Sequence, residues 1–523
     1  MLVGLRRSNP APRRKDGVTR PQTTLFWFRR DLRLGDNPAL SEAIARARED
    51  GGDLLPAFVW DPRERRHWAA GAAAHWWLWN SLVALDGDLR RLGSRLALGQ
   101  GAPTVVLPKL ARAASARTVV WAAGLEPDEL ADDDALAATL AGIGVEAVVV
   151  PSANLLFDPA LIHTREGRPY TVFTPYWRRC LSGPAPAEPL AAPEALPAAP
   201  SRPAGLALGV LEAEARRAWA AGFTGVWQPG EAGARLALAR LVRGPLAVYA
   251  DDRDRPDLQS TSRLSPHLHW GELSARQVWQ AVSGELAEAG LDVEAAVGPP
   301  TWDDEQAPGL RRSAGAFLRQ LGWREFGHHL LRHFPKTPER PLHERFAAFP
   351  WRDDQAGLEA WRYGLTGYPF VDAGMRELWA TGWMHNRARL VAASFLVKHL
   401  LLPWRNGEAW FWDTLVDADL ASNALGWQWV AGCGADAAPY FRIFNPVTQG
   451  RRYDPDGAYV RRWIPEIASL PAAHIHAPWL APAEVLAQAG VTLGETYPAP
   501  IVDHGEARSR ALAAYDVVKH APR

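Results

Sequence analysis

The chain has 523 residues, of which 47% are hydrophobic and 22% are charged. This length predicts two or more domains, and the composition excludes a disordered or fibrous protein. Its 58 Lys and Arg residues balance 58 Asp and Glu residues, so any surface that binds phosphate groups must be a local patch. Only two cysteines are present, Cys180 and Cys433, which excludes a disulfide scaffold and a four-thiolate cluster built from this chain alone.

The first residues are basic but lack the apolar stretch of a secretory signal. Pro10, Pro12, Asp16 and Gly17 would interrupt an amphipathic transit helix. We therefore expect residues 1–22 to form a disordered tail and the protein to be cytoplasmic. No apolar run is long enough to cross a bilayer, so no membrane partner is expected.

Residues 23–155 alternate short apolar runs with amphipathic helical segments. Five runs predict buried parallel strands: TLFWFRR, LLPAFVW, TVVLP, TVVWAA and VEAVVV. This alternation is typical of a doubly wound parallel sheet with right-handed crossovers. Because no strand ends in a G-x-G-x-x-G fingerprint, this α/β domain is not expected to bind a dinucleotide in the Rossmann manner.

Ala and Pro dominate residues 181–208, which favours an extended linker, and we assign residues 156–220 to the interdomain segment. Helical periodicity dominates residues 221–500, which predicts an all-α second domain. Residues 501–523 are expected to be a C-terminal tail. Helix starts and stops are marked by residues such as Ser274, Gly364 and Gly382.

A hydroxyl-rich segment precedes one of the predicted helices. Thr261, Ser262 and Ser265 lie within five residues of the chain. Hydroxyls, backbone N–H groups and a helix N-terminus all favour an anion, so this segment is a candidate pyrophosphate site. An ordinary Ser/Thr helix cap explains the same spacing equally well, and both interpretations stay open.

The amphipathic segment Leu318–Leu330 carries Trp323 beside Arg324. It also carries Glu325 and His328 at the Glu-x-x-His spacing of half a di-iron site. The partner motif is missing from the sequence, so a solvated or hydrogen-bonded histidine pair is favoured and no metal is expected.

Two further segments combine charge with apolar surroundings. Arg387 and Arg389 fall within one helical turn, which on spacing alone favours a surface charge stripe. Asp417, Asp419 and Asn423 stand in an apolar, Trp-containing stretch. Buried carboxylates need partners, and Arg389 is the natural candidate for Asp417. Polar groups converging in an apolar helical domain are typical of a cofactor pocket, although a capped, solvated helix start fits equally well.

Three blocks of sequence occur in the order found in one family: FWFRRDLRLGDNPAL from Phe26, GLTGYPFVDAGMR from Gly364, and ALGWQWVAGCGADAAPYFRIFNP ending at Pro446. With them the chain closely resembles the DNA photolyase/cryptochrome family, in particular bacterial class I and class III cyclobutane-dimer photolyases. The resemblance covers nearly all of the chain except the tail and the linker. It implies an N-terminal α/β domain, a long interdomain segment and a helical FAD domain, in agreement with the architecture inferred above.

The resemblance implies that FAD is the cofactor. The residues that it assigns to FAD are Tyr249, Thr261, Ser262, Arg263, Leu264, Ser265, Phe317, Arg389, Asp417, Ala418, Asp419 and Asn423. Phe317 stands where the family commonly has Trp, and Arg389 and Asp417 resemble the ion pair near the isoalloxazine. Asn423 falls beside the flavin N5 position, where an amide can adapt to either protonation state; signalling relatives often carry Asp or Cys there.

The resemblance also implies an electron relay and contacts to UV-damaged DNA. The relay residues are Trp427, Trp404 and Trp351. The implied lesion-pocket and phosphate contacts are Arg253, Gln320, Trp323, Arg324, Asn386, Arg387, Leu390 and Trp429. A flipped thymine dimer needs apolar walls together with cations for the backbone. The implied reaction is electron donation from light-excited FADH⁻ to the dimer, ring splitting and electron return, with Gln320 and Asn423 as further catalytic residues.

The chain departs from the family pattern in the lesion pocket. Gln320 stands where cyclobutane-dimer photolyases usually have Glu, and an amide cannot transfer a proton, so repair is expected to be slower or lost. Leu390 replaces a common Met but keeps its bulk. The (6-4) photolyases need a His pair where this chain has Asn386 and Leu390. In the stretch that would bind a methenyltetrahydrofolate antenna, Asp128 and Glu129 are expected to form a surface acidic helix start.

The preferred hypothesis is a monomeric cyclobutane-dimer photolyase. The alternative is a photolyase-like cryptochrome that binds FAD and responds to light but repairs poorly. Gln320 favours the photoreceptor, whereas Asn423, the set of DNA contacts and the absence of a long C-terminal extension favour the enzyme. A helical nucleic-acid-binding protein without flavin would explain the arginines but not Asp417, Asp419 and Asn423.

Overall fold

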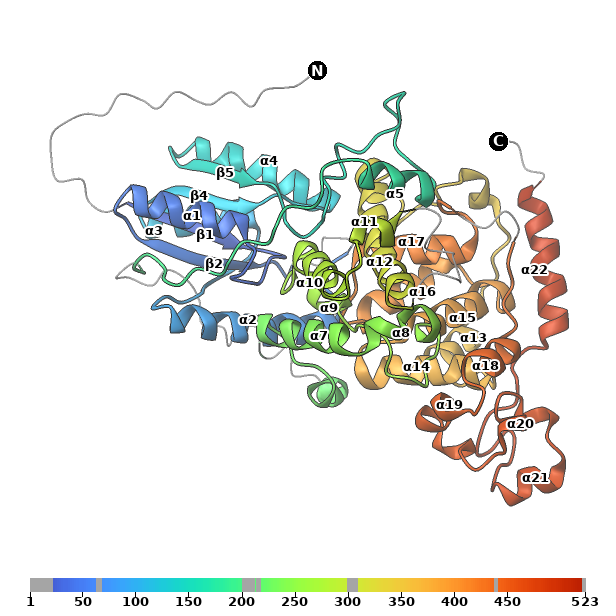
Figure 1. The fold of residues 1–523 in the computed structure, drawn as a ribbon. Coiled ribbons are helices and arrows are strands. Elements are labelled where there is room, and N and C mark those ends of the chain that lie inside the picture. Colours follow the sequence, from blue (N-terminus) through green and yellow to red (C-terminus); the bar gives the residue numbers. More distant parts are fainter. Residues whose placement is uncertain are drawn as a thin grey trace, which may run out of the picture.

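The computed structural model describes residues 22–62, 68–199, 212, 218–298, 309–436 and 441–519, so nearly all of the expected N-terminal tail lies outside the described residues. An α/β domain and a helical domain lie side by side (Figure 1). The fold class predicted from the sequence is therefore confirmed.

The α/β domain is built on a five-stranded parallel sheet with the strand order β3-β2-β1-β4-β5. Its strands are β1 (Thr23–Phe28), β2 (Leu54–Trp60), β3 (Ala97–Gln100), β4 (Ala116–Ala122) and β5 (Glu146–Val150). β1 lies at the centre and is buried along its whole length, with Phe26 paired to Pro56 of β2 and Val120 of β4. A central strand buried on both faces reads as a continuous apolar run, which is why β1 could be recognised from its sequence.

Helices cover both faces of this sheet. One face packs against α1 (Pro38–Glu49) and α2 (Ala72–Arg91). The opposite face packs against α3 (Pro103–Ala113) and α4 (Pro127–Ala141). The α2 helix also contacts the helical domain, so its buried tryptophans Trp76 and Trp77 belong to a core that both domains share.

One of the five predicted strands is wrong. The run TVVLP lies inside α3, and the third strand is the shorter segment Ala97–Gln100. Pro103 at the first turn favours a helix. Burial then follows helical spacing, because Leu107 and Ala111 face the core while Val105 is exposed. A short apolar run cannot by itself distinguish a strand from a helix.

The second domain is helical over its described residues. Its helices are η2 (Ala218–Gly225), α7 (Glu231–Arg243), α8 (Pro245–Asp252), α9 (Ser265–His269), α10 (Ala275–Glu288), α11 (Val293–Val297), α12 (Gly309–His333), η3 (Glu344–Ala348), α13 (Gln355–Arg362), α14 (Pro369–Thr381), α15 (Asn386–Ser394), η4 (Phe395–His399), α16 (Trp404–Thr414), α17 (Leu420–Ala431), α18 (Pro446–Tyr453), α19 (Ala458–Trp463), η5 (Pro465–Ile467), α20 (Ala472–Ile475), η6 (Pro478–Leu480), α21 (Ala483–Gln488) and α22 (His504–Lys519). Ser274 caps α10 through a capping box, and Gly382 ends α14 in the left-handed conformation.

The interdomain segment is partly helical. Within it, α5 (Phe173–Leu181) buries Tyr176 and Trp177 in the core of the helical domain. Residues 182–199 contain no helix or strand and lie along the α/β domain, where Ala198 accepts a hydrogen bond from Leu54. Over its described residues, the extended linker expected at residues 181–208 therefore has no regular secondary structure after α5, which ends at Leu181.

The C-terminal segment differs from the tail expected at residues 501–523. It contains the helix α22, and Ala511 and Val518 of this helix are fully buried in the core of the helical domain. Tyr515 stacks on Phe441 with ring centroids 4.6 Å apart. The expected tail is therefore wrong for residues 504–519, where Ala507, Ala511, Ala514 and Val518 follow helical spacing on the buried face.

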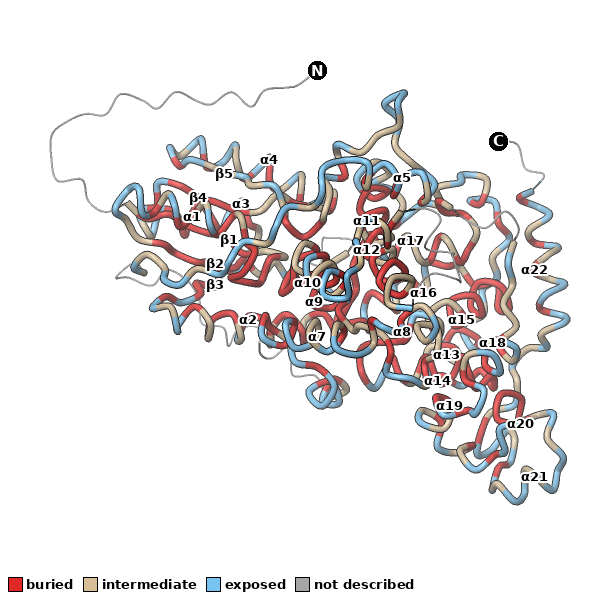
Figure 2. The backbone as a smooth tube through the Cα atoms, viewed as in Figure 1, coloured by how far each residue is buried: buried red, intermediate tan, exposed pale blue. Residues whose placement is uncertain are grey.

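Buried charge joins the two domains, which share a hydrophobic core and both contain buried backbone segments (Figure 2). Arg33, just after β1, is fully buried and donates hydrogen bonds to Asn154 Oδ1 at 2.7 Å and to Gly271 O at 2.7 Å. Glu231 of α7 accepts a hydrogen bond from the amide of Leu34 at 2.7 Å. The connection between β1 and α1 is thus held by charge-assisted hydrogen bonds to the helical domain.

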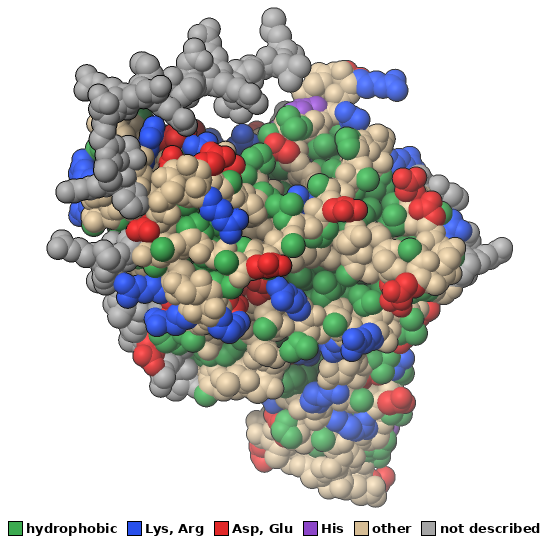
Figure 3. Space-filling view, turned by 60° about the vertical axis from the view of Figure 1, so that its left-hand side comes forward, with side chains coloured by type: hydrophobic (Ala, Val, Ile, Leu, Met, Phe, Trp, Pro, Cys, Tyr) green, Lys and Arg blue, Asp and Glu red, His purple; other side chains and the backbone are tan. Residues whose placement is uncertain are grey.

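The surface carries charge of both signs. On the face drawn in Figure 3, Lys and Arg side chains lie among Asp and Glu rather than in one continuous field, in keeping with the net charge of zero. Within the described ranges, no helix is both long enough and apolar enough to span a bilayer.

Replacing Arg33 with Met is expected to destabilise the protein by about 3–5 kcal/mol, because the change leaves buried acceptors without their charged donor. The control is Arg90→Met, since Arg90 pairs with Asp86 but is 65% exposed, and about 1 kcal/mol or less is expected. Thermal and denaturant unfolding measure both variants. Equal losses in the two would contradict the role of Arg33.

Candidate functional site

A cavity of about 180 Å³ opens in the helical domain between α15, α16 and α17. Its lining includes many of the residues predicted from the sequence: Asn386, Arg389, Leu390, Asp417, Ala418, Asp419, Asn423 and Trp427. The structure therefore brings together one end of the predicted cofactor site, the inner residue of the predicted relay and two of the predicted lesion contacts.

The predicted ion pair forms at this cavity. Arg389 Nη2 lies 2.9 Å and 3.1 Å from the two carboxylate oxygens of Asp417, and Arg389 Nε donates to Met384 O at 2.7 Å. Asp417 is only 7% exposed, so its charge depends on this partner. A surface charge stripe, the interpretation favoured by spacing alone, is wrong for Arg389.

Asp419 and Asn423 are buried rather than solvated. Asp419 caps α17 by accepting a hydrogen bond from the amide of Ser422 at 2.8 Å. Burial alone would raise the pKa of Asp419, but His328, His269 and Arg324 hold it well below its usual value. Asn423 donates Nδ2 to the carbonyl of Glu408 at 3.1 Å, which fixes the orientation of its amide.

This donor and acceptor set fits a flavin ring. A cation, two carboxylates and an amide converge on a cavity whose other walls are apolar, including Phe411, Leu415 and Val430. The volume is below the roughly 300–1,000 Å³ of a pocket that holds a whole ligand. A whole dinucleotide therefore does not fit inside the cavity, and any FAD whose ring is bound here has to extend along neighbouring elements.

The predicted phosphate segment lies near α8 and α12, which pack on each other, and α12 also packs on α17. Tyr249 of α8 contacts Phe317 of α12 with ring centroids 5.2 Å apart. Arg263 has a positive φ of 53° and lies over the ring of Trp383, while Leu264 is buried in the core. The Ser262 hydroxyl accepts a hydrogen bond from the amide of Leu264 at 3.3 Å, and the carbonyls of Thr261 and Ser262 accept hydrogen bonds from Arg240 of α7 at 3.1 Å and 3.2 Å.

Three predicted lesion contacts lie on α12 in different environments. Gln320 is half-buried and its side chain donates to Ala316 O at 3.4 Å. Trp323 stacks on Phe173 of α5 with centroids 3.9 Å apart. Arg324 was expected to contact DNA, but in this structure its guanidinium donates to Asn154 O at 2.6 Å and to Leu268 O at 3.2 Å at the domain interface.

The remaining predicted DNA contacts are dispersed. Asn386 is exposed at the start of α15. Arg387 pairs with Asp254 at 2.6 Å and lies 4.3 Å from the ring centroid of Tyr453. Arg253 lies over the ring of Tyr249. Trp429 lines a separate small hollow with Lys398 and Phe441 rather than the cavity of Asn386 and Leu390.

The predicted relay spans two cavities. Trp427 lines the first cavity, whereas Trp404 and Trp351 line a larger one of about 910 Å³ at the start of α16. Trp427 and Trp404 share one apolar core, and Trp351 packs at its edge. Gly407 lies flat against the Trp427 ring, where a Cβ would overlap the indole. The sequence did not single out Trp361, whose ring centroid lies 6.1 Å from that of Trp427.

Glu408 is a second residue that sequence reasoning missed. It is fully buried on α16, and its carboxyl oxygens have no hydrogen-bond partner among the described residues. Burial raises its pKa well above the usual value. In a sequence, a single Glu in an amphipathic helix indicates a solvated face. The burial of Glu408 becomes visible only in the tertiary structure.

The expected acidic surface at the start of α4 is wrong for Glu129. Glu129 is only 7% exposed, and it shares Arg30 with Glu126 at 3.0 Å and 2.7 Å respectively. Asp128 is exposed as expected. The partner arginine comes from the end of β1, about a hundred residues earlier in the chain, so local sequence could not indicate the burial.

Glu325 and His328 have different partners in the structure. The described part of the chain has no cluster of His, Cys, Asp and Glu suited to a metal ion. Glu325 accepts hydrogen bonds from the amides of Leu156 at 3.0 Å and Phe157 at 3.2 Å, and burial raises its pKa to about 7. His328 is buried, and its Nε2 lies 3.3 Å from Asp419 Oδ2. Its neighbour His329 is also buried and accepts a hydrogen bond from the amide of Tyr170 at 3.0 Å, so a solvated histidine pair is wrong.

Two family profiles match the chain: the FAD binding domain of DNA photolyase over residues 317–517, and DNA photolyase over residues 24–198. The chain is 45% identical to a deoxyribodipyrimidine photo-lyase of Agrobacterium fabrum, over 95% of this chain and 98% of that protein. The chain belongs to the DNA photolyase/cryptochrome family. This family membership agrees with the cation, the two carboxylates and the amide that converge on the cavity in the helical domain.

A cryptochrome and a photolyase of known structure from the family are also similar to this chain. Cryptochrome-1 of Arabidopsis thaliana is 40% identical over 93% of this chain and 69% of that protein. The crystal structure of a bacterial class III photolyase from Agrobacterium tumefaciens superimposes with a TM-score of 0.87 at 43% identity, covering 97% of this chain and 100% of that one. Both photolyases and cryptochromes of the family are thus similar to this chain, and the site has to distinguish between them.

Glu325 gives a prediction for stability against pH. Because its pKa in the fold is about 7 and its ordinary value is 4.5, the folded protein keeps a proton that the unfolded chain releases between these values. The contribution of Glu325 to stability therefore falls as the pH rises from 5 to 8, by about 3 kcal/mol at most. Glu325→Gln removes this part of the slope. Denaturant unfolding at pH 5 and pH 8 measures it, and identical slopes in both proteins would contradict the assignment.

Proposed function

We propose that this protein is a light-dependent deoxyribodipyrimidine photo-lyase that splits cyclobutane pyrimidine dimers in UV-damaged DNA. The observation that carries the proposal is the cavity where the Arg389–Asp417 pair, Asp419 and Asn423 converge. The 45% identity to a deoxyribodipyrimidine photo-lyase along nearly the whole chain supports it. When bound, FAD supplies the absorption of light and the transferred electron.

The residues of the cavity bind and orient the ring. Arg389 and Asp417 hold each other in place and present fixed charges to a polar edge, while Asp419 supplies a second acceptor. Asn423 has its NH₂ group bound to Glu408, so its amide is pre-oriented before any ligand enters. Trp427 and the apolar walls exclude water, which strengthens every polar contact inside.

For the lesion we propose that Gln320, Trp323, Asn386 and Leu390 form the pocket wall, with Arg253, Arg324, Arg387 and Trp429 on the strand that carries it. Arg387 is held by Asp254 in the free protein, and a phosphate would compete for it. Since Asp254 is 29% exposed, exchanging one anion for another costs little. Arg324 would have to leave two interface carbonyls, so we assign it the weaker role.

We propose that Trp427, Trp404 and Trp351 pass electrons inward to the cofactor. The support is their continuity through one apolar core from the first cavity to the edge of the second. Indole side chains can be oxidised one electron at a time, and dry, rigid surroundings keep their spacing constant. We also propose that the protein acts as a cytoplasmic monomer, and that a methenyltetrahydrofolate antenna remains a candidate second chromophore.

A second candidate function is a photolyase-like cryptochrome with weak or no repair. Gln320 favours it, because an amide at the lesion cannot donate a proton as a carboxylic acid does. The 40% identity to cryptochrome-1 of Arabidopsis thaliana is compatible with it. Repair of a defined lesion under light separates the two functions.

The reduced wild-type protein is expected to restore thymine-dimer oligonucleotides under blue light, and Gln320→Glu is expected to do so about tenfold faster, since it restores an acidic proton at the lesion. Repair is measured by chromatography of the products, with a dark sample as the control. If neither protein repairs while both bind FAD and respond to light, the photoreceptor is the correct function.

Trp427→Phe is expected to slow photoreduction of the oxidised flavin by about tenfold or more while FAD content is kept, because Phe fills the space but is much harder to oxidise. Tryptophan radical absorption after a laser flash measures the effect. Trp77→Phe is the matched control, since Trp77 is buried in the core shared with the α/β domain. Unchanged photoreduction in Trp427→Phe would contradict the relay.

A further inference from the structure

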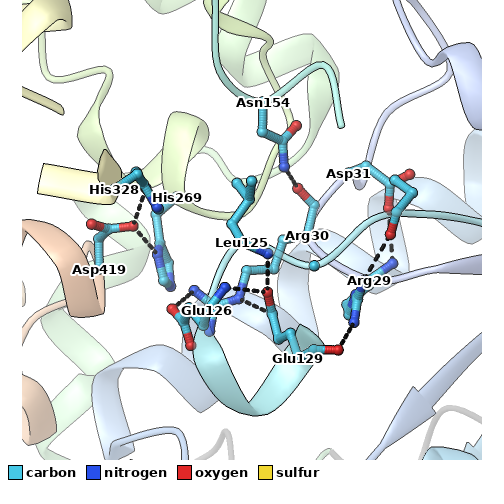
Figure 4. A network of polar contacts seen from close by, with 12 residues as sticks. Arg29, Arg30, Asp31, Leu125, Glu126, Glu129, Asn154, His269, His328 and Asp419 are labelled. Carbon is cyan, nitrogen blue, oxygen red and sulfur yellow. Dashed lines mark hydrogen bonds and ion pairs between the residues drawn. The ribbon is translucent and has the colours of Figure 1, made fainter. Parts of the chain in front are cut away.

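Asp419 stands where the flavin cavity meets the domain interface (Figure 4). Its Oδ1 caps α17, and its Oδ2 lies 3.3 Å from Nε2 of His328 and 3.7 Å from Nδ1 of His269. His328 belongs to α12 and His269 to the end of α9, and both are nearly fully buried. Two imidazoles from separate elements thus lie against one oxygen of a carboxylate that lines the cofactor cavity.

Arg30 brings the α/β domain into the same set of contacts. It leaves the end of β1 and pairs with Glu126 at 2.7 Å and Glu129 at 3.0 Å, both from the start of α4. Its carbonyl accepts a hydrogen bond from Asn154. The same carbonyl touches Gly271, a residue with a φ of +66°, where a Cβ would overlap the oxygen. Both domains therefore fix the position of Arg30.

The charges in this set influence one another. Burial alone would lower the pKa of Arg30, but Glu126, Glu129 and Asp419 together raise it, so the guanidinium stays charged. Burial raises the pKa of Glu126 against the opposing charge of Arg30. For Glu129 the charges of Arg30 and Arg29 outweigh burial and lower the pKa. Arg30 is thus a cation of the α/β domain that lies beside the segment holding His269, since its carbonyl packs against Gly271, two residues further along the chain (Figure 4).

We propose that Arg30, His269 and His328 are positioning residues that hold Asp419 as an oriented carboxylate at the flavin cavity, so that the α/β domain sets how easily the bound flavin is reduced. This inference rests on the proposed binding of FAD. The function assigned to the domain interface is separate from the binding of the flavin ring and from the binding of DNA.

The charges predict effects of opposite sign. Reduction adds negative charge to the cavity, which the field of Arg30 favours and the charge of Asp419 disfavours. Removing Arg30 leaves Glu126 and Glu129 without their shared cation, so reduction becomes harder. Removing the His328 donor disfavours the charged form of Asp419, so reduction becomes easier. A loss of folding alone would change the ease of flavin reduction in the same direction in both variants.

The test is a redox titration of FAD in the purified holoprotein against dyes of known potential. At a fixed dye potential, Arg30→Gln is expected to lower the ratio of reduced to oxidised flavin by about three- to tenfold, and His328→Phe to raise it by a similar factor. A tenfold change corresponds to about 59 mV for a one-electron couple. His328→Gln keeps a donor and is expected to restore the wild-type ratio. Arg30→Lys keeps the charge and is expected to shift it less than Arg30→Gln.

The control is Arg276→Gln, which breaks another interdomain ion pair, that of Arg276 with Asp36 at 2.5 Å, and does not touch Asp419. It is expected to lower thermal stability without changing the ratio. The inference would be overturned if Arg30→Gln and His328→Phe bind flavin at the wild-type reduction potential. It would also be overturned if the reduction potential shifts in the same direction in both variants. Wild-type protein that takes up no FAD would overturn the proposed function instead, so the two failures are distinguishable.

Discussion

Two carboxylates at the start of α17, Asp417 and Asp419, impose the constraint on which the rest of the site depends. Each is only 7% exposed, and a buried charge is stable only if other elements supply its partners. Asp417 obtains Arg389 from α15, and Asp419 obtains His328 from α12 and His269 from α9. Satisfying the two charges therefore fixes the mutual positions of α9, α12, α15 and α17, and two of these, α15 and α17, line the cavity together with α16.

The same requirement extends to the domain interface. Arg33 and Arg30 both follow β1, and both place charge between the α/β domain and the helical domain. The segment that follows the central strand of the sheet therefore supplies cations to the interface with the helical domain. Weakening the interface is expected to affect the cofactor before it unfolds either domain.

Much of the fold could be predicted, because long apolar runs and helix caps are local signals: β1, the Ser274 cap and the left-handed Gly382 all lie where expected. The strand predicted for TVVLP was wrong because this segment is part of α3 and its buried residues have helical spacing, despite its β-branched residues. Of the site, the pairing of Arg389 with Asp417 was predictable from the cost of buried charge. The burial of Glu129 and Glu408 was not, because the partners and neighbours that surround them come from distant parts of the chain.

The central claim is that the Asp417–Asp419–Asn423 cavity holds the isoalloxazine ring of FAD. The most direct measurement is the stoichiometry and absorption spectrum of flavin in purified wild-type protein and in Asp417→Leu, which leaves Arg389 unpaired at the cavity. The account predicts one FAD per wild-type chain with a structured flavin band, and loss of most of it in the variant. Wild-type protein that stays colourless after incubation with FAD, or a variant that binds FAD as well as the wild type, would contradict it.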